Sequence, residues 1–168
     1  MSGALIVTAE FGPQDFVWLN ALRARHFPPE RNQLPAHLTL FHAIPPSAEQ
    51  EVRTRLRAAA AGSAPSARIA GLMDLGGGVA LRIVSDDLDS IRGEIVDGLH
   101  GLLGAQDAQG WRPHVTIQNK VAPKLARELL QSLERGFEPR PLKISGLALH
   151  RYLGGPWDPL GVYAFRKP

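Results

Sequence analysis

The chain has 168 residues, of which 44% are hydrophobic and 21% are charged, a composition typical of one globular domain with a sizeable core. It contains no Cys, which excludes a disulfide framework, a thiolate metal site and a Cys nucleophile. The net charge of +3 is compatible with a nucleotide or RNA partner but does not require one.

The first predicted element is a buried strand over residues 3–9, because this apolar run shows no helical periodicity. No basic segment precedes the run, and it ends at Ala9-Glu10, so it is too short for a signal peptide or a membrane span. We therefore expect a cytoplasmic protein without a membrane partner. We also expect a monomer that needs no obligate protein partner.

Helices and strands alternate along the rest of the chain. Proline and glycine positions, capping residues and apolar spacing predict helices over residues 13–28, 48–61, 86–103 and 123–135. The intervening segments predict strands over residues 36–41, 67–75, 79–84, 113–118, 142–153 and 160–166. Residues 104–110 are expected to form a polar loop.

The same order of elements occurs twice, which indicates a duplicated fold. We expect an α+β class: a bilobal, pseudo-two-fold fold in which two small mixed or antiparallel sheets face each other across a cleft, with helices outside. Strand–helix–strand connections favour parallel neighbours, whereas the hairpins supply antiparallel pairs. Residues 1–168 would form a single domain with interleaved lobes of roughly 1–84 and 79–168.

Two tetrads occupy equivalent places in this repeat: His37-Leu38-Thr39-Leu40 and His114-Val115-Thr116-Ile117. On a strand, alternate side chains share a face, so each His and its Thr point the same way, about 7 Å apart, and the apolar residues point into the core. A single such pair is typical of an ordinary polar strand face. The doubling in a repeat with 6 His in total favours one shared site.

Two imidazoles and two hydroxyls restrict the chemistry of this site. Two His are too few for a zinc site, and neither tetrad contains an acidic residue, so we expect no metal and no cofactor. One imidazole can accept a proton while the other donates one, and Thr hydroxyls can donate hydrogen bonds to phosphate oxygens. A phosphodiester is the natural substrate for such a pair, and a strained 2',3'-cyclic phosphate is especially suitable.

The doubled His-x-Thr-x motif and its strand–helix repeat resemble the 2H phosphoesterase superfamily. The segments 25–42 and 111–117 are similar to its bacterial 2'-5' RNA ligase-like branch. The resemblance covers essentially the whole chain and implies cyclic phosphodiesterase chemistry, with reversible 2'-5' RNA ligation in some members. It assigns the catalytic roles to His37, Thr39, His114 and Thr116. The alternative is a nucleotide- or RNA-binding module of the same fold without turnover.

Further candidates for substrate binding follow from strand parity. Phe41 shares the parity of His37, and Gln118 holds the matching place in the second half, so both are expected to border the cleft. His42 has the opposite parity and is expected in the core or at the end of the strand. Arg82, His150 and Tyr152 face away from the apolar side of their strands and are candidate phosphate or base contacts. Arg31 and the loop 104–110 are weaker candidates. The near-symmetry of the pair leaves open which His is acid and which is base.

Overall fold

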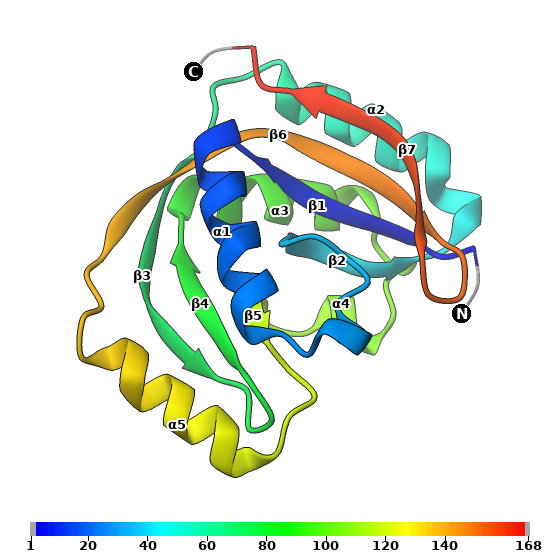
Figure 1. The fold of residues 1–168 in the computed structure, drawn as a ribbon. Helices are drawn as coiled ribbons and strands as arrows, with labels where there is room; N and C mark the ends of the chain where they lie inside the picture. Colours follow the sequence, from blue (N-terminus) through cyan, green and yellow to red (C-terminus); the bar gives the residue numbers. More distant parts are fainter. Residues whose placement is uncertain (1–2, 167–168) are drawn as a thin grey trace.

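The computed structural model describes residues 3–166 (Figure 1). Its strands are β1 (Leu5–Phe11), β2 (Leu38–Ile44), β3 (Ser66–Asp74), β4 (Val79–Val84), β5 (His114–Gln118), β6 (Arg140–Tyr152) and β7 (Trp157–Ala164). Its α-helices are α1 (Pro13–His26), α2 (Glu49–Ala60), α3 (Asp86–Gly98), α4 (Ala105–Ala108) and α5 (Pro123–Glu134). Two short 3-10 helices, η1 (Pro29–Arg31) and η2 (Pro46–Ala48), precede β2 and α2.

The strands form one sheet in the order β1-β2-β5-β4-β3-β6-β7. An additional pairing between β1 and β6 closes the first six strands into a barrel-like arrangement, and β7 lies outside it as an extra strand on β6. Strands from the two halves of the chain interleave, because β2 pairs with β5 and β6 pairs with both β1 and β3. The motif strands β2 and β5 are neighbours.

Helices cover the outer side of this sheet. Helices α1 and α5 pack on the part formed by β3, β4 and β5, whereas α2 packs on α3 and along β6 and β7 (Figure 1). The core lies between these helices and the sheet. It contains all four apolar members of the tetrads, and Leu38, Leu40, Val115 and Ile117 are each 0% exposed. The tetrads are therefore anchored through their apolar residues, as the alternation predicts.

The expected α+β class with helices outside is confirmed. Every strand pair within residues 3–166 is antiparallel, so the expectation of parallel neighbours is wrong. The clearest case is β1 and β2, which are joined by α1 but lie side by side as antiparallel strands. The division into two lobes stays a prediction.

Several boundaries differ from the expected ones. Helix α3 ends at Gly98 rather than near 103, and the expected loop contains the short helix α4. Ser85 caps α3, because its Oγ accepts a hydrogen bond of 3.0 Å from the backbone N–H of Leu88. Strand β7 begins at Trp157, directly after the turn, rather than at 160. None of the helices in the described part of the chain has the length and apolarity that a membrane span requires.

Candidate active site

The two tetrads meet where β2 pairs with β5. Leu38 is the antiparallel partner of Val115. The register on either side of this pair places His37 opposite Thr116 and Thr39 opposite His114. Cross-strand neighbours of this kind have Cβ atoms about 5 Å apart, so the four polar side chains form one cluster on the face opposite the core. The pairing makes the two His-Thr pairs reciprocal neighbours.

Both motif histidines are held by a backbone carbonyl two residues upstream. The Nδ1 of His37 lies 2.8 Å from the carbonyl oxygen of Pro35, and the Nδ1 of His114 lies 2.7 Å from that of Arg112. A carbonyl oxygen only accepts hydrogen bonds, so Nδ1 carries the proton in both rings. The Nε2 of each neutral ring is therefore left with its lone pair, on the opposite side of the ring from the carbonyl.

A β-bulge lies at the last residue of each tetrad and reverses the side-chain alternation. Thr8 and Val7 are successive residues of β1, but their partners on β2 are Thr39 and Phe41, which are two positions apart. Because two residues then oppose one, Leu40 and Phe41 both face the core. Phe41 is 0% exposed, so the expectation that it borders the cleft is wrong. His42 is turned to the cleft instead of the core.

The second bulge has the same position in β5. Val79 and Ala80 are successive residues on β4, but their partners are Gln118 and Thr116. Gln118 is consequently 7% exposed, and its Oε1 has no hydrogen-bond partner in the described part of the chain. The expected place of Gln118 at the cleft border is therefore also wrong, for the same physical reason.

Three side chains donate hydrogen bonds to carbonyl groups of the motif strands. Arg92 of α3 reaches the carbonyl oxygen of Leu40 through Nε at 2.9 Å, and Trp111 reaches that of Thr39 through Nε1 at 3.0 Å. In the second half, Nη1 of Arg23 from α1 lies 3.1 Å from the carbonyl oxygen of Thr116. Both arginines are buried. These contacts satisfy backbone oxygens at or beside the bulges and fix the direction of the tetrads.

A cavity of about 380 Å³ opens over the tetrads, within the size range of small-molecule sites. All four motif residues line it. The remaining lining comes from β1, from β2 beyond the bulge, from α3, from the segment around α4 and from the start of β7: Ile6, His42, Arg92, Gln106, Gln109, Gly110, Trp111, Arg112 and Trp157. None of these described lining residues is acidic, so the wall favours an anionic ligand.

The two motif histidines differ in their surroundings. The ring of Trp157 meets the ring of His37 edge-on, with centroids 5.0 Å apart. The pKa of His37 is lowered from 6.5 to about 4, chiefly by burial, with smaller contributions from nearby positive charge such as that of Arg23, and against the opposing hydrogen bond to Pro35. His37 is therefore neutral near pH 7, and a neutral imidazole can accept a proton.

The other candidates lie around this cavity rather than in it. His150 accepts or donates a hydrogen bond of 2.9 Å with Thr8, its ring lies 5.2 Å from that of Trp157, and burial lowers its pKa. It lines a smaller apolar cavity that shares His37 and Trp157 with the first. Tyr152 is the cross-strand partner of Trp157 and does not line either cavity.

Arg82 and Arg31 also lie outside the motif cavity. Arg82 is the cross-strand partner of His114, but its guanidinium lies across β3, 3.5 Å from the carbonyl oxygen of Ala70 and over Gly71. Arg31 lines a separate surface pocket. The loop 104–110 does reach the cavity through Gln106, Gln109 and Gly110. Substrate contact by Arg82, His150 or Tyr152 stays a prediction.

Sequence reasoning missed Trp157, His42 and Arg112. Trp157 directly follows the turn Gly154-Gly155-Pro156, and an aromatic residue in that position is a signal that could have been noticed. Arg112 precedes its tetrad by two residues. His42 could not be found, because the bulge that turns it to the cleft has no signature in the sequence.

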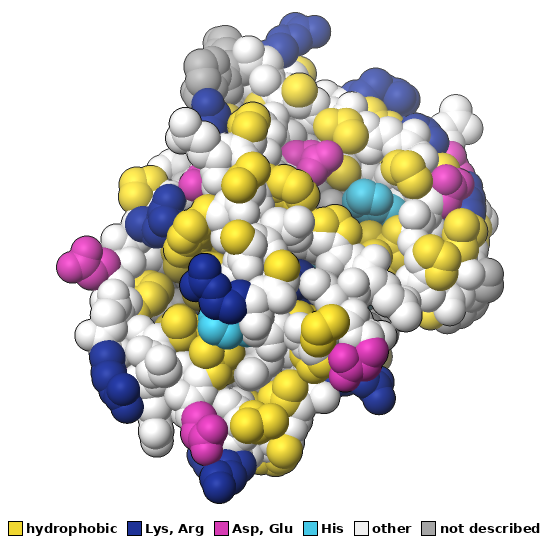
Figure 2. Space-filling view, in the orientation of Figure 1, with side chains coloured by type: hydrophobic (Ala, Val, Ile, Leu, Met, Phe, Trp, Pro, Cys, Tyr) yellow, Lys and Arg dark blue, Asp and Glu magenta, His cyan; other side chains and the backbone are white. Residues whose placement is uncertain are grey.

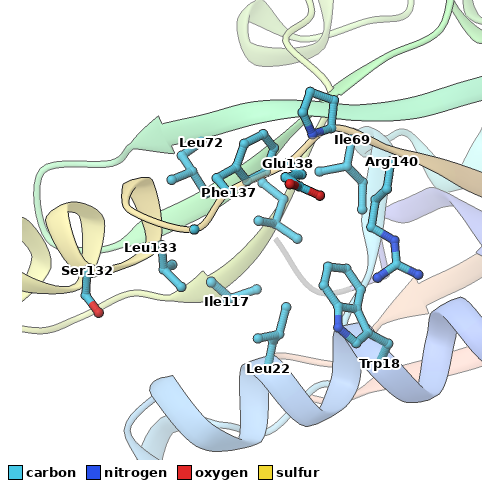
Figure 3. Close-up of a pocket in the computed structure, with 13 residues that line it drawn as sticks. Trp18, Leu22, Ile69, Leu72, Ile117, Ser132, Leu133, Phe137, Glu138 and Arg140 are labelled. Atoms are coloured by element: carbon cyan, nitrogen blue, oxygen red, sulfur yellow. The ribbon is translucent and has the colours of Figure 1, made fainter.

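A larger apolar cavity of about 510 Å³ lies on the opposite side of β5. It is bounded by Trp18 and Leu22 of α1 and by Leu133 of α5 (Figure 3). Ile117, the residue after Thr116, lines it, but no motif His or Thr does. The two cavities are thus separated by the motif strand, and of these two only the smaller one is lined by histidines. Within residues 3–166, no three His, Asp or Glu side chains are grouped to bind one metal ion.

Comparisons with known proteins give the family to which this fold and this two-histidine site belong. Residues 11–156 match the model of the 2'-5' RNA ligase superfamily, so the chain belongs to that superfamily. Membership supports a phosphoesterase-type function. None of the curated protein sequences compared with this chain matches it.

Solved structures share the fold at low sequence identity. The protein TT0787 of Thermus thermophilus is 17% identical with a TM-score of 0.67, and the alignment covers 98% of each chain. A crystal structure described as a phosphoesterase is 18% identical with a TM-score of 0.61, covering 98% of this chain and 99% of that one. E. coli LigT in complex with 3'-AMP is 14% identical with a TM-score of 0.61, covering 99% and 100%.

Proposed function

We propose that the protein is a metal-independent cyclic phosphodiesterase that hydrolyses a 2',3'-cyclic phosphate at an RNA end or on a small nucleotide. As a related activity, the same His and Thr side chains would form a 2'-5' RNA bond reversibly. One observation carries the proposal: two imidazoles, each with Nδ1 held by a backbone carbonyl, line one cavity together with two Thr hydroxyls. Binding alone needs no such pair of proton-transfer groups.

We assign the role of base to His37, because burial lowers its pKa and keeps its ring neutral, and the role of acid to His114 as the other imidazole of the pair. Neutral His37 accepts a proton through Nε2 from a water molecule as the water oxygen forms a bond to phosphorus. Protonated His114 donates a proton to the ribose oxygen as the ring P–O bond breaks. One phosphomonoester and one ribose hydroxyl result, and the two histidines have exchanged protonation states. Thr39 and Thr116 donate hydrogen bonds to the non-bridging oxygens, where negative charge develops.

Nucleotides are favoured as ligands by two further observations. The cavity walls carry neutral and cationic side chains, and a fold neighbour, E. coli LigT, was crystallised with 3'-AMP. On the face of the molecule in Figure 2, acidic and basic side chains are interspersed instead of forming one basic patch. We therefore attribute phosphate recognition to the cleft itself.

The test is incubation of the protein, in buffer with EDTA, with adenosine 2',3'-cyclic phosphate and with an oligonucleotide that ends in a cyclic phosphate. We expect a phosphomonoester product that persists in EDTA and is lost by orders of magnitude in His37→Ala and in His114→Ala. Complete loss of turnover on chelation would refute the metal-free mechanism. Binding of both compounds without any product would instead favour a nucleotide- or RNA-binding module.

A further inference from the structure

The cavity extends past the two tetrads to a third histidine, His42. Thr39 is the partner of Thr8 on β1, and His42 lies near Ile6, two residues further along β1. Ile6 lines the same cavity. Two strand positions correspond to about 7 Å. This is the span of one nucleotide unit, so a ligand held at the tetrads can extend to His42.

A buried carboxylate fixes the orientation of His42. Asp107 is 2% exposed, and its Oδ1 accepts hydrogen bonds from the backbone N–H of His42 at 2.7 Å and from Nδ1 of His42 at 3.2 Å. Its Oδ2 accepts one from the N–H of Ala43 at 2.8 Å. Burial alone would raise the pKa of Asp107, but the hydrogen bonds from His42 and Ala43 outweigh it and keep the pKa below the usual value. The carboxylate is thus ionised, and the Nε2 of His42 is directed away from it.

The groups around His42 are suited to an anion. The imidazole is 42% exposed and shares the cavity wall with Arg112, Gln106 and Gln109. Within residues 3–166, no ion pair includes Arg112. Asp107 is the acidic group behind this wall, and its oxygens are already occupied by the bonds just described. A phosphate at Nε2 would place the ring of His42 between two anions.

We propose that His42, positioned by Asp107, binds a second phosphate of the substrate, the 5'-phosphate of the nucleotide whose 2',3'-cyclic phosphate lies between the tetrads. This inference rests on the proposed function for the position of the first phosphate. The second phosphate is either the phosphomonoester of a small nucleotide or the phosphodiester that links the terminal nucleotide to the rest of an RNA. A cyclic mononucleotide with a free 5'-hydroxyl leaves the His42 end of the cavity without an anion.

The test compares three ligands by isothermal titration calorimetry: adenosine 3'-phosphate, adenosine 3',5'-bisphosphate and the dinucleotide ApAp with a 3'-terminal phosphate. We expect at least one of the last two to bind wild type tenfold or more tightly than adenosine 3'-phosphate, which corresponds to about 1.4 kcal/mol. In His42→Gln this affinity ratio should fall to near 1. In His100→Gln, which alters an exposed histidine outside the cavity, the ratio should remain.

The arms of the experiment separate the two sources of the second phosphate. Preference for the bisphosphate alone indicates a small nucleotide, and preference for the dinucleotide indicates an RNA end. Equal affinity of wild type for all three ligands, or an unchanged ratio in His42→Gln, would overturn the proposal. Binding does not require turnover, so a protein that shows the His42-dependent ratio but no hydrolysis would refute the proposed function and support this subsite.

Discussion

The pKa of His37 gives the sharpest test of the site. Lowering this pKa from 6.5 to about 4 corresponds to a preference of about 3 kcal/mol for the neutral ring. Burial is the main cause, and the ring of Trp157 covers one side of His37. Replacing Trp157 with Ala admits water to that side, so the pKa of His37 should rise toward 6.5.

The assay is a titration of the histidine Cε1–H signals by NMR, with His37→Gln used to assign the resonance. We expect a midpoint near pH 4 in the free wild type, a higher midpoint in Trp157→Ala, and a higher midpoint on addition of adenosine 3'-phosphate, whose negative charge favours the imidazolium. A midpoint at or above 6.5 in the free wild type would refute the reasoning. It would also remove the ground for naming His37 as the base.

The same pKa predicts how stability depends on pH. The folded-state value lies below the unfolded value, so the unfolded chain binds more protons at His37 between pH 6.5 and 4. The contribution of neutral His37 is therefore fully present above pH 6.5 and is lost as pH falls toward 4. Urea denaturation at several pH values should show wild type losing up to about 3 kcal/mol more than His37→Gln across this range. Parallel pH profiles for the two proteins would contradict the expectation.

Three further predictions test the groups around the cleft. His114→Ala should hydrolyse a cyclic phosphate very slowly but should regain part of its activity on 2'-deoxyadenosine 3'-(4-nitrophenyl) phosphate, because the leaving group of this substrate needs no proton. His37→Ala should show no such rescue. Equal rescue of both variants would contradict the assigned roles. Thr39→Val and Thr116→Val should each lower kcat by about 100-fold in steady-state assays while Tm stays unchanged, and near-normal kcat would refute their donation to phosphate. Arg23→Met leaves the carbonyl of Thr116 without its hydrogen-bond donor and should lower the free energy of unfolding, measured by urea denaturation, by about 1.5–3 kcal/mol. A decrease below about 0.5 kcal/mol would show that the fold does not need this contact.

The fold class and the clustering of the four motif side chains could be predicted because both depend on short-range patterns. Helix and strand alternation follows from apolar spacing, and the His-x-Thr tetrads reveal their shared face through the two-residue period of a strand. Because the motif occurs twice, the sequence also indicates the second pair of His and Thr side chains that meets the first. No comparable local signal determines that β1 and β2 are antiparallel, because strand direction depends on the path of the connecting segment through space.

The border of the site could not be predicted, because parity arguments fail at a bulge. One extra residue in β2 moves Phe41 into the core and brings His42 to the cavity. The same event in β5 moves Gln118 inward. Nothing in Leu40 or Ile117 distinguishes a bulged residue from a regular one. The bulge depends instead on long-range partners that satisfy the displaced backbone groups.

Those partners are the two buried arginines, and their arrangement explains why the bulges occur in equivalent places. Arg23 comes from α1, in the first half of the chain, and holds the carbonyl of Thr116 in the second half. Arg92 comes from α3, in the second half, and holds the carbonyl of Leu40 in the first. Each guanidinium lies over an aromatic ring, that of Phe27 at 4.1 Å and that of Phe41 at 4.7 Å. Each half therefore supplies a buried donor for the motif strand of the other half, so the backbone geometry of each tetrad depends on a side chain from the opposite half.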